Sequence, residues 1–220
     1  MTRLTLDVVR SAMRQPLPGW PAQLRMAPPG RAEVAAPDIA PRKAGVLLLL
    51  YPHREALHFV LTRRTDRLGH HSGQIALPGG RREPCDADFT ATALREAREE
   101  LGIALDAAEP LGPLTALYVP PSNFVVHPSV AYVPARPDFR PNADEVAEVI
   151  EVPLSDLLDP ARRGAEPRPL VSLGGALRMT PHYRFGEYKV WGATAMVLSE
   201  FEALLRGVAP NNTTCQVELY

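Results

Sequence analysis

The sequence predicts a sandwich of the α+β or α/β class, because strand pairs with short turns are interspersed with separate amphipathic helices. The apolar run GVLLLLY at 45–51 is too short to span a bilayer and is typical of a buried strand. The partly alternating segment 57–63 follows it across the turn YPHREA. Together the two segments predict a β-hairpin.

Helical patterns occupy three separate segments. Residues 4–14 repeat apolar side chains every three or four positions. A second helix begins after Asp88 or Thr90, either of which can cap it, and ends at the residue before Gly102. A final amphipathic helix covers 192–206. Its expected inward-facing residues are Ala195, Leu198, Phe201, Leu204 and Leu205.

Shorter elements connect these segments. Residues 16–41 are rich in proline and are predicted to form a linker, and residues 162–176 are predicted to form a loop. The other predicted elements are strands at 112–119, 128–134 and 147–152 and a short helix at 154–159. We therefore expect an N-terminal helix with a proline-rich lead-in at 1–43, the main domain at 44–206 and a tail at 207–220.

The charge balance limits the classes of partner. With 24 Lys and Arg against 25 Asp and Glu, the formal net charge is −1, so no strong global field would attract nucleic acid or an anionic membrane. Any anion-binding site must therefore be local. The cysteines, Cys85 and Cys215, lie far apart and suggest neither a disulfide framework nor a zinc cluster, so we expect a reducing, cytoplasmic location.

The stretch LREAREELG at 94–102 concentrates acidic residues on one part of the second helix. Glu96, Glu99 and Glu100 share a sector about 100° wide, because residues three and four apart lie on nearly the same side. Arg95 stands one turn before Glu99 and can hold its carboxylate, whereas Arg98 points away from the sector. Two interpretations follow from the helix alone: a solvated face with ion pairs, or a cradle for a metal ion.

A longer motif around this helix resembles the box of the Nudix hydrolases, G-x5-E-x7-R-E-U-x-E-E-x-G-U, where U is aliphatic. The chain has GGRREPCDADFTATALREAREELGI at 79–103, which matches the second half if Ala97 is accepted as aliphatic. The first half departs, because Asp86 replaces glutamate and eight residues, not seven, separate it from Arg95. Coenzyme A-cleaving members of the family often show this aspartate and this spacing.

A second resemblance precedes the box. VLTRRTDRLGHHSGQIALPGG at 60–80 is similar to the segment L-L-T-x-R-[S/A]-x3-R-x3-G-x3-F-P-G-G of the coenzyme A pyrophosphatase branch. It departs at Thr65, at Leu77 and at Gly69, where the branch has an arginine that could bind phosphate. YKVWGATAMVL at 188–198 also looks like that branch, so the resemblance spans roughly 44–206.

The resemblance implies a Nudix fold, a mixed β-sheet sandwiched between α-helices, with a divalent metal at the acidic helix. Mg²⁺ or Mn²⁺ suits carboxylate ligands, and the lack of a His/Cys set argues against zinc. The implied ligands are Glu96, Glu99 and Glu100. We expect Glu99, Glu100 and Arg95 to serve catalysis. The base that accepts the proton of the attacking water is left open among Glu145, Glu148 and a box glutamate, with Glu145 favoured.

Several residues could contact a phosphorylated substrate. Basic side chains before the box offer positive charge for phosphates, although each could equally be a surface residue. They are Arg63, Arg64, Arg67, His70 and His71. Gly80 lets the backbone approach the acidic helix. The loop at 118–128 could reach a ligand or form only a rigid turn. The candidate substrate-binding residues are Arg64, Arg67, His70, Gly80, Ser122 and Asn123.

The resemblance implies hydrolysis of the pyrophosphate of coenzyme A or an acyl derivative. The alternatives are another nucleoside diphosphate derivative, such as ADP-ribose, a dinucleotide or a (d)NTP, and a Nudix-fold module that binds without turnover. The intact REAREE at 95–100 argues against the last. The expected partner is a small nucleotide, without nucleic acid or membrane, and a homodimer is left open.

Overall fold

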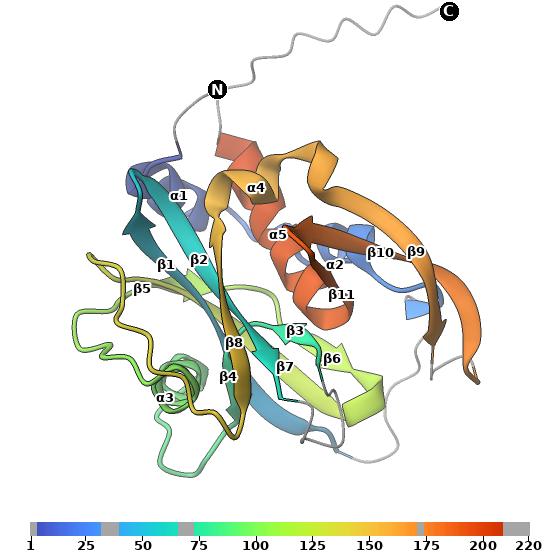
Figure 1. Ribbon diagram of the computed structural model, residues 1–220, viewed down its shortest axis with the longest axis horizontal. Coiled ribbons are helices and arrows are strands. Elements are labelled where there is room, and N and C mark those ends of the chain that lie inside the picture. Colours follow the sequence, from blue (N-terminus) through green and yellow to red (C-terminus); the bar gives the residue numbers. More distant parts are fainter. Residues whose placement is uncertain (1–3, 32–39, 66–72, 171–173, 209–220) are drawn as a thin grey trace, which may run out of the picture.

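A mixed β-sheet lies between two layers in the computed structural model, which describes residues 4–31, 40–65, 73–170 and 174–208 (Figure 1). Helix α3 covers one face of this sheet. Helix α5, the N-terminal helices and a smaller three-stranded sheet cover the other. The expected sandwich of a mixed sheet between helices is confirmed.

The central hairpin joins β1 (Arg42–His53) to β2 (Ala56–Arg64). The turn residues Arg54 and Glu55 both have positive φ, 45° and 62°, which is the backbone of a tight two-residue hairpin turn. Leu47 to Tyr51 are fully buried, because both faces of β1 are covered. The hairpin predicted at 45–63 is therefore confirmed.

The rest of the main sheet surrounds this hairpin. β1 pairs in parallel with β7 (Phe124–Tyr132), and β2 pairs antiparallel with β8 (Val146–Pro153). The short strands are β3 (Ile75–Ala76), β4 (Gly79–Arg81), β5 (Glu109–Pro113) and β6 (Leu117–Val119). The single strand predicted at 112–119 is thus two strands, both paired with β7, with a break between them.

Helix α3 (Phe89–Leu101) begins at Asp88, whose side chain accepts from Ala91 N–H at 2.7 Å. It ends at Leu101, and Gly102 follows with a φ of +60° at a place where a Cβ atom would collide with the backbone of Arg140. Both ends match the prediction. Ala93, Ala97 and Leu101 of α3 are buried in one cluster with Leu47, Leu49 and Tyr51 of β1. This packing fixes the rotation of the helix and hence the direction of its acidic sector.

Helix α5 (Gly192–Val208) anchors the opposite layer. All five residues that the sequence placed inward are buried at 3% exposure or less. The elements packed around α5 are α1 (Leu6–Met13), α2 (Gly19–Gln23), the 3₁₀ turn η1 (Leu24–Met26) and α4 (Leu154–Leu158). The small sheet has β9 (Arg163–Leu170), β10 (Ala176–Phe185) and β11 (Tyr188–Trp191).

Two sequence predictions are corrected by this layer. The loop expected at 162–176 is wrong, because β9 and β10 pair there along eight residues. Pro167 and Pro169 are tolerated in β9 because it is an edge strand, so a missing N–H need not face a neighbour. The linker expected at 16–41 is also partly wrong, since α2 and η1 fold onto α5. Within the described residues, 3₁₀ turns also form at η3 (Pro120–Ser122) and η4 (Pro160–Arg162).

Candidate active site

Three glutamates of α3 form the acidic surface of the site. Glu96, Glu99 and Glu100 share one sector of the helix. Their exposure differs: the Glu99 side chain is 56% exposed, that of Glu96 is 16% exposed and that of Glu100 is 4% exposed. Arg98 is exposed outside this sector. The site therefore combines one buried, one half-buried and one exposed carboxylate.

The backbone of β4 reaches these carboxylates through two glycines. Gly79 N–H donates to Glu100 Oε2 at 3.3 Å. A Cβ atom added at Gly80 would overlap the Glu96 carboxylate, so a larger residue would displace it. The close approach expected of Gly80 is thus present in the structure.

Arg95 organises the carboxylates from within the helix. Its Nη1 donates to Glu96 Oε1 at 3.0 Å and to Glu99 Oε2 at 3.1 Å. Its Nε and Nη2 donate to the two oxygens of Asp86, and Nη2 also donates to the Arg81 carbonyl at 3.0 Å. The Arg95 guanidinium holds the pKa of Asp86 well below its ordinary value. Asp86 therefore pairs with a basic group within the motif.

The pKa shifts of the helix glutamates show that Glu145, which is distant in sequence, lies near them. Burial raises the pKa of Glu100 to about 7, and it raises the pKa of Glu96 as well. The positive charge of Arg64 opposes the rise at Glu100. The negative charge of Glu145 adds to the rise at both carboxyls. Glu145 therefore lies close enough to share the electrostatic field of Glu96 and Glu100.

The chain holds Glu145 there through the end of β2. Thr65 N–H donates to the Glu145 carbonyl at 3.0 Å, and Thr65 Oγ1 donates to the Asp144 carbonyl at 3.0 Å. Glu148 is differently placed, because its carboxylate pairs with Arg63 at 3.2 Å and accepts from the Tyr188 hydroxyl. The Tyr188 hydrogen bond and Arg63 lower the pKa of Glu148. Glu148 is thus engaged structurally, whereas Glu145 belongs to the acidic group.

The donor set fits a hard divalent cation. Carboxylate oxygens are the ligands that Mg²⁺ and similar ions prefer. Glu145 raises the pKa of both Glu96 and Glu100, and Glu96 also raises that of Glu100, so a cation among these carboxylates would relieve their repulsion. Within the described ranges, no three Asp, Glu, His or Cys side chains surround one point as they stand, and Glu99 is turned toward Arg95. Glu99 is exposed enough to rotate toward the other two carboxylates.

A cavity of about 440 Å³ opens beside the acidic helix. Arg64 lines it, and Arg64 Nη1 lies 3.8 Å from Glu100 Oε1. Gly79 and Gly80 line it too. The other walls are mostly apolar and include Val46, Ile75, Val119, Pro120, Pro121, Phe124, Val126, Leu170 and Met196. Among the described residues that line the cavity, three are arginines and none is acidic.

The other sequence-predicted binding residues fall in different places. Ser122 lines the cavity. Asn123 is absent from the described lining; its Oδ1 accepts from the Tyr118 hydroxyl at 3.1 Å and its φ is 50°, so it shapes the loop. Arg67 and His70 lie outside the residues that the structure describes.

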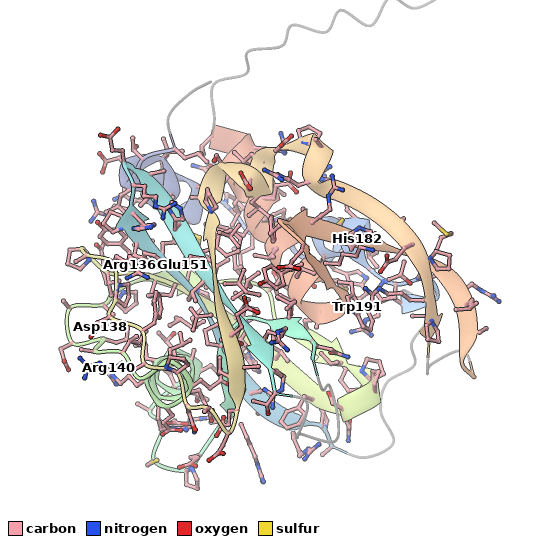
Figure 2. The ribbon with its side chains drawn as sticks, viewed as in Figure 1. Arg136, Asp138, Arg140, Glu151, His182 and Trp191 are labelled. Atoms are coloured by element: carbon pink, nitrogen blue, oxygen red, sulfur yellow. The ribbon has the colours of Figure 1, made fainter. Side chains whose placement is uncertain are left out.

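Sequence reasoning missed part of the cavity wall. Pro28, Pro29 and Arg31 reach it from the N-terminal segment, and Arg81 reaches it from β4. No motif marks them, because the contacts depend on how the chain folds back. Trp191 is half-buried in the wall, with the Arg168 guanidinium 4.7 Å from its ring centre. Figure 2 shows it near His182, its partner in the small sheet.

A second hollow of about 440 Å³ lies past the end of α3 and is a weaker candidate. Arg136, Asp138 and Arg140 line it (Figure 2). Both cations are already neutralised, since Arg136 pairs with Glu151 at 2.7 Å and Arg140 pairs with Asp138 at 2.7 Å. The hollow therefore offers little unpaired charge for a ligand.

The chain is similar in sequence to known proteins. Residues 41–173 match the NUDIX domain family. The human protein named mitochondrial coenzyme A diphosphatase NUDT8 is 39% identical over 191 residues, which cover 86% of this chain and 74% of that protein. The uncharacterized Nudix hydrolase NudL of Citrobacter koseri is 36% identical over 184 residues, which cover 82% of this chain and 91% of that protein.

A solved structure supports the fold alone. The MutT/nudix family protein from Enterococcus faecalis aligns with a TM-score of 0.50 at 16% identity, covering 91% of this chain and 73% of that chain. None of the helices in the described residues is both long and apolar enough to cross a membrane.

Proposed function

The chain belongs to the Nudix hydrolase family, and from this premise we propose that it hydrolyses the pyrophosphate bond of coenzyme A or an acyl-coenzyme A. Water would attack one phosphorus atom, and the bond from that phosphorus to the bridging oxygen would break. The products would be adenosine 3′,5′-bisphosphate and 4′-phosphopantetheine. The name of the human relative, a coenzyme A diphosphatase, supports this substrate over other nucleoside diphosphates.

The position of Glu100 carries the proposal. Its carboxylate accepts from Gly79 N–H and lies beside Arg64, and both of these residues line the cavity. The carboxylates of the acidic helix therefore lie next to a cavity whose described lining includes arginines and no acidic residue. A pyrophosphate can occupy the arginine side while the rest of the substrate extends along the apolar walls.

Glu96, Glu99 and Glu100 would hold the divalent cation, which we propose to be Mg²⁺ or Mn²⁺. When bound, such an ion neutralises part of the pyrophosphate charge and makes a bound water more acidic. Arg95 keeps Glu96 and Glu99 oriented, since it donates to both. The three glutamates would thus supply the charge that binds the cation, and Arg95 would fix the positions of two of them.

We propose Glu145 as the base that accepts the proton of the attacking water. It shares the electrostatic field of Glu96 and Glu100. Glu148 is less suited, because Arg63 and Tyr188 engage its carboxylate and lower its pKa. Glu100 has a pKa near neutrality without a cation, but a bound cation would lower that pKa and remove its basicity.

Arg64 would bind the pyrophosphate. It lines the cavity, and its Nε is buried without a hydrogen-bond partner among the described residues. Arg81 and Ser122 would contact the substrate from neighbouring walls. The cytoplasmic location and the domain boundaries stay predictions, and a homodimer stays open.

A substrate panel tests the proposal. Purified enzyme is incubated with Mg²⁺ or Mn²⁺ and with coenzyme A, an acyl-coenzyme A, ADP-ribose, a dinucleotide and a (d)NTP, and the products are identified by mass. We expect adenosine 3′,5′-bisphosphate and a phosphopantetheine from the coenzyme A substrates. Brisk cleavage of ADP-ribose or a dinucleotide without cleavage of coenzyme A would rule out coenzyme A as the substrate. The assignment as a pyrophosphate hydrolase would then still hold.

A further inference from the structure

The N-terminal segment before β1 is built into the wall of the substrate cavity. α2 packs on α5, and the carboxylate of Glu200 in α5 accepts from Gln23 Nε2 at 2.9 Å and from Gly19 N–H at 3.2 Å. Ser199 Oγ donates to the Ala22 carbonyl at 2.7 Å. Glu200 is fully buried, so these contacts are shielded from water. The segment is therefore held in a fixed place as it leads to the cavity.

The segment brings a cation to that wall. Pro28, Pro29 and Arg31 all line the cavity. Arg31 N–H donates to the Pro28 carbonyl at 3.2 Å, and the Arg31 guanidinium lies 5.6 Å from the ring centre of Trp20. Arg31 is half-buried, and no carboxylate among the described residues pairs with it. Its charge is available to an anion inside the cavity.

The sheet places Arg31 away from the reacting end. Gln23 Nε2 donates to the carbonyl of Thr115, just before β6, at 2.9 Å, so the segment that carries Arg31 is anchored at the β6 side of the sheet. β6 pairs with β7, β7 pairs with β1 and β1 pairs with β4, so three strand spacings, about 14 Å in all, separate β6 from the glycines of β4. The side chain of Arg31 can extend from the β6 side toward β4 over part of this distance.

The cavity thus has two positive regions with an apolar stretch between them. Arg64 and Arg81 are the cations of the reacting end, beside Glu100 and β4. Val126 and Phe124 of β7 line the wall between that end and β6. A ligand that fits this pattern carries a pyrophosphate and, a few bonds beyond it, a second anionic group.

We infer that Arg31 is a specificity-determining residue that binds a phosphate monoester on the ribose of the substrate nucleotide. The inference rests on the proposed function, which supplies the 3′-phosphate of coenzyme A as that group. The arginine expected at position 69 from the related branch is a glycine here, and Arg31 provides positive charge from a different part of the chain. A charge-assisted hydrogen bond from arginine to phosphate would favour the phosphorylated ribose about 10- to 100-fold.

Kinetics on matched substrates test the inference. kcat/KM is measured for coenzyme A and for 3′-dephospho-coenzyme A with wild-type enzyme, Arg31→Gln and Arg31→Lys. We expect wild type to prefer coenzyme A about 10- to 100-fold, Arg31→Gln to bring the ratio near one, and Arg31→Lys to restore part of it. Arg25→Ala is the control, because Arg25 is exposed on the same segment and does not line the cavity. A preference that persists unchanged in Arg31→Gln would overturn the inference.

A binding measurement separates this inference from the proposed function. Calorimetry without metal compares adenosine 3′,5′-bisphosphate with adenosine 5′-monophosphate on wild type and Arg31→Gln. We expect tighter binding of the bisphosphate by wild type and loss of that difference in the variant. If coenzyme A is not cleaved but the difference depends on Arg31, the proposed substrate fails and the inference stands. Equal binding of the two nucleotides by wild type would overturn the inference even where coenzyme A is cleaved.

Discussion

Both carboxylate oxygens of Asp86 accept hydrogen bonds from Arg95, at 3.0 Å from Nε and 3.1 Å from Nη2. Asp86 is itself held by Glu83 N–H at 2.9 Å and by Thr92 Oγ1 at 2.9 Å. The motif departs from the family pattern in two ways here, a shorter acid and one extra residue before the helix. Asp86 lies in the loop before α3, and its shorter side chain still reaches the arginine.

Arg95→Ala should lower kcat about tenfold or more, because Glu96 and Glu99 lose the donor that orients them. Arg98→Ala is the matched control: Arg98 is exposed outside the acidic sector, so its removal should change kcat little. Arg95→Lys should not restore activity, since lysine cannot reproduce the forked contacts to Asp86. Steady-state kinetics at saturating metal decide this, and equal losses at positions 95 and 98 would contradict the helix phase.

Glu99→Gln and Glu100→Gln should each lower kcat by about 10²-fold or more, because each removes a charged ligand of the proposed cation. The metal-free melting temperature should hold or rise, since neutralising Glu99 relieves its repulsion with Glu96, and neutralising Glu100 relieves its repulsion with Glu96 and Glu145. Added Mg²⁺ should raise the melting temperature of wild type more than that of either variant. Full activity in either variant would rule out the metal cradle.

Glu145→Gln should lower kcat by about 10²-fold or more while the fold is retained, as expected for loss of a general base. Glu148→Gln should act mainly on stability, because it disturbs the contacts to Arg63 and Tyr188. Comparing kcat, KM and melting temperature for the two variants separates these roles. A larger loss of kcat at position 148 would reverse the assignment.

His58 should contribute a pH-dependent part of stability. Burial lowers its pKa, so the folded state keeps it neutral while the unfolded chain takes up a proton as the pH falls through its ordinary value of 6.5. Stability from this group is complete above that pH and is lost below it. Melting temperatures from about pH 8 to about pH 5 should fall less steeply in His58→Gln than in wild type. The pKa values of His127 and His182 are also lowered, so the melting temperature of His58→Gln should still fall somewhat as the pH falls.

The local parts of the site could be predicted from the sequence. The helical period alone places Glu96, Glu99 and Glu100 in one sector, and Gly102 alone marks where the helix ends. The hairpin of β1 and β2 follows from apolar runs and a short turn. These features depend on neighbours within a few residues, so the sequence contains the information directly.

The long-range parts could not be predicted. Gln23 meets Glu200 across 177 positions, and no local pattern marks that pair. The choice between Glu145 and Glu148 likewise depends on which of them meets Arg63 and Tyr188 after folding. The prolines of β9 led to the wrong prediction of a loop, because proline usually breaks a strand and is accepted only at a sheet edge. Whether a strand lies at an edge depends on the whole sheet.

Glu200 should connect the stability of the N-terminal segment to substrate binding. Its carboxylate accepts from Thr115 N–H at 3.1 Å as well as from Gln23 and Gly19. Glu200→Ala would leave these donors buried without an acceptor, which should cost about 3 kcal/mol or more of the free energy of unfolding. Glu187→Ala is the control, because Glu187 is exposed in the turn between β10 and β11 and should change stability by about 0.5 kcal/mol or less.

The same variant tests whether the segment completes the cavity. If α2 loosens from α5, Pro28, Pro29 and Arg31 lose their fixed places in the wall, so KM for coenzyme A should rise more than kcat falls. Amide hydrogen exchange at residues 19–23 should speed up in Glu200→Ala, while exchange in α3 should stay slow. A variant that is less stable but keeps the wild-type KM would show that the segment supports the fold without shaping the substrate site.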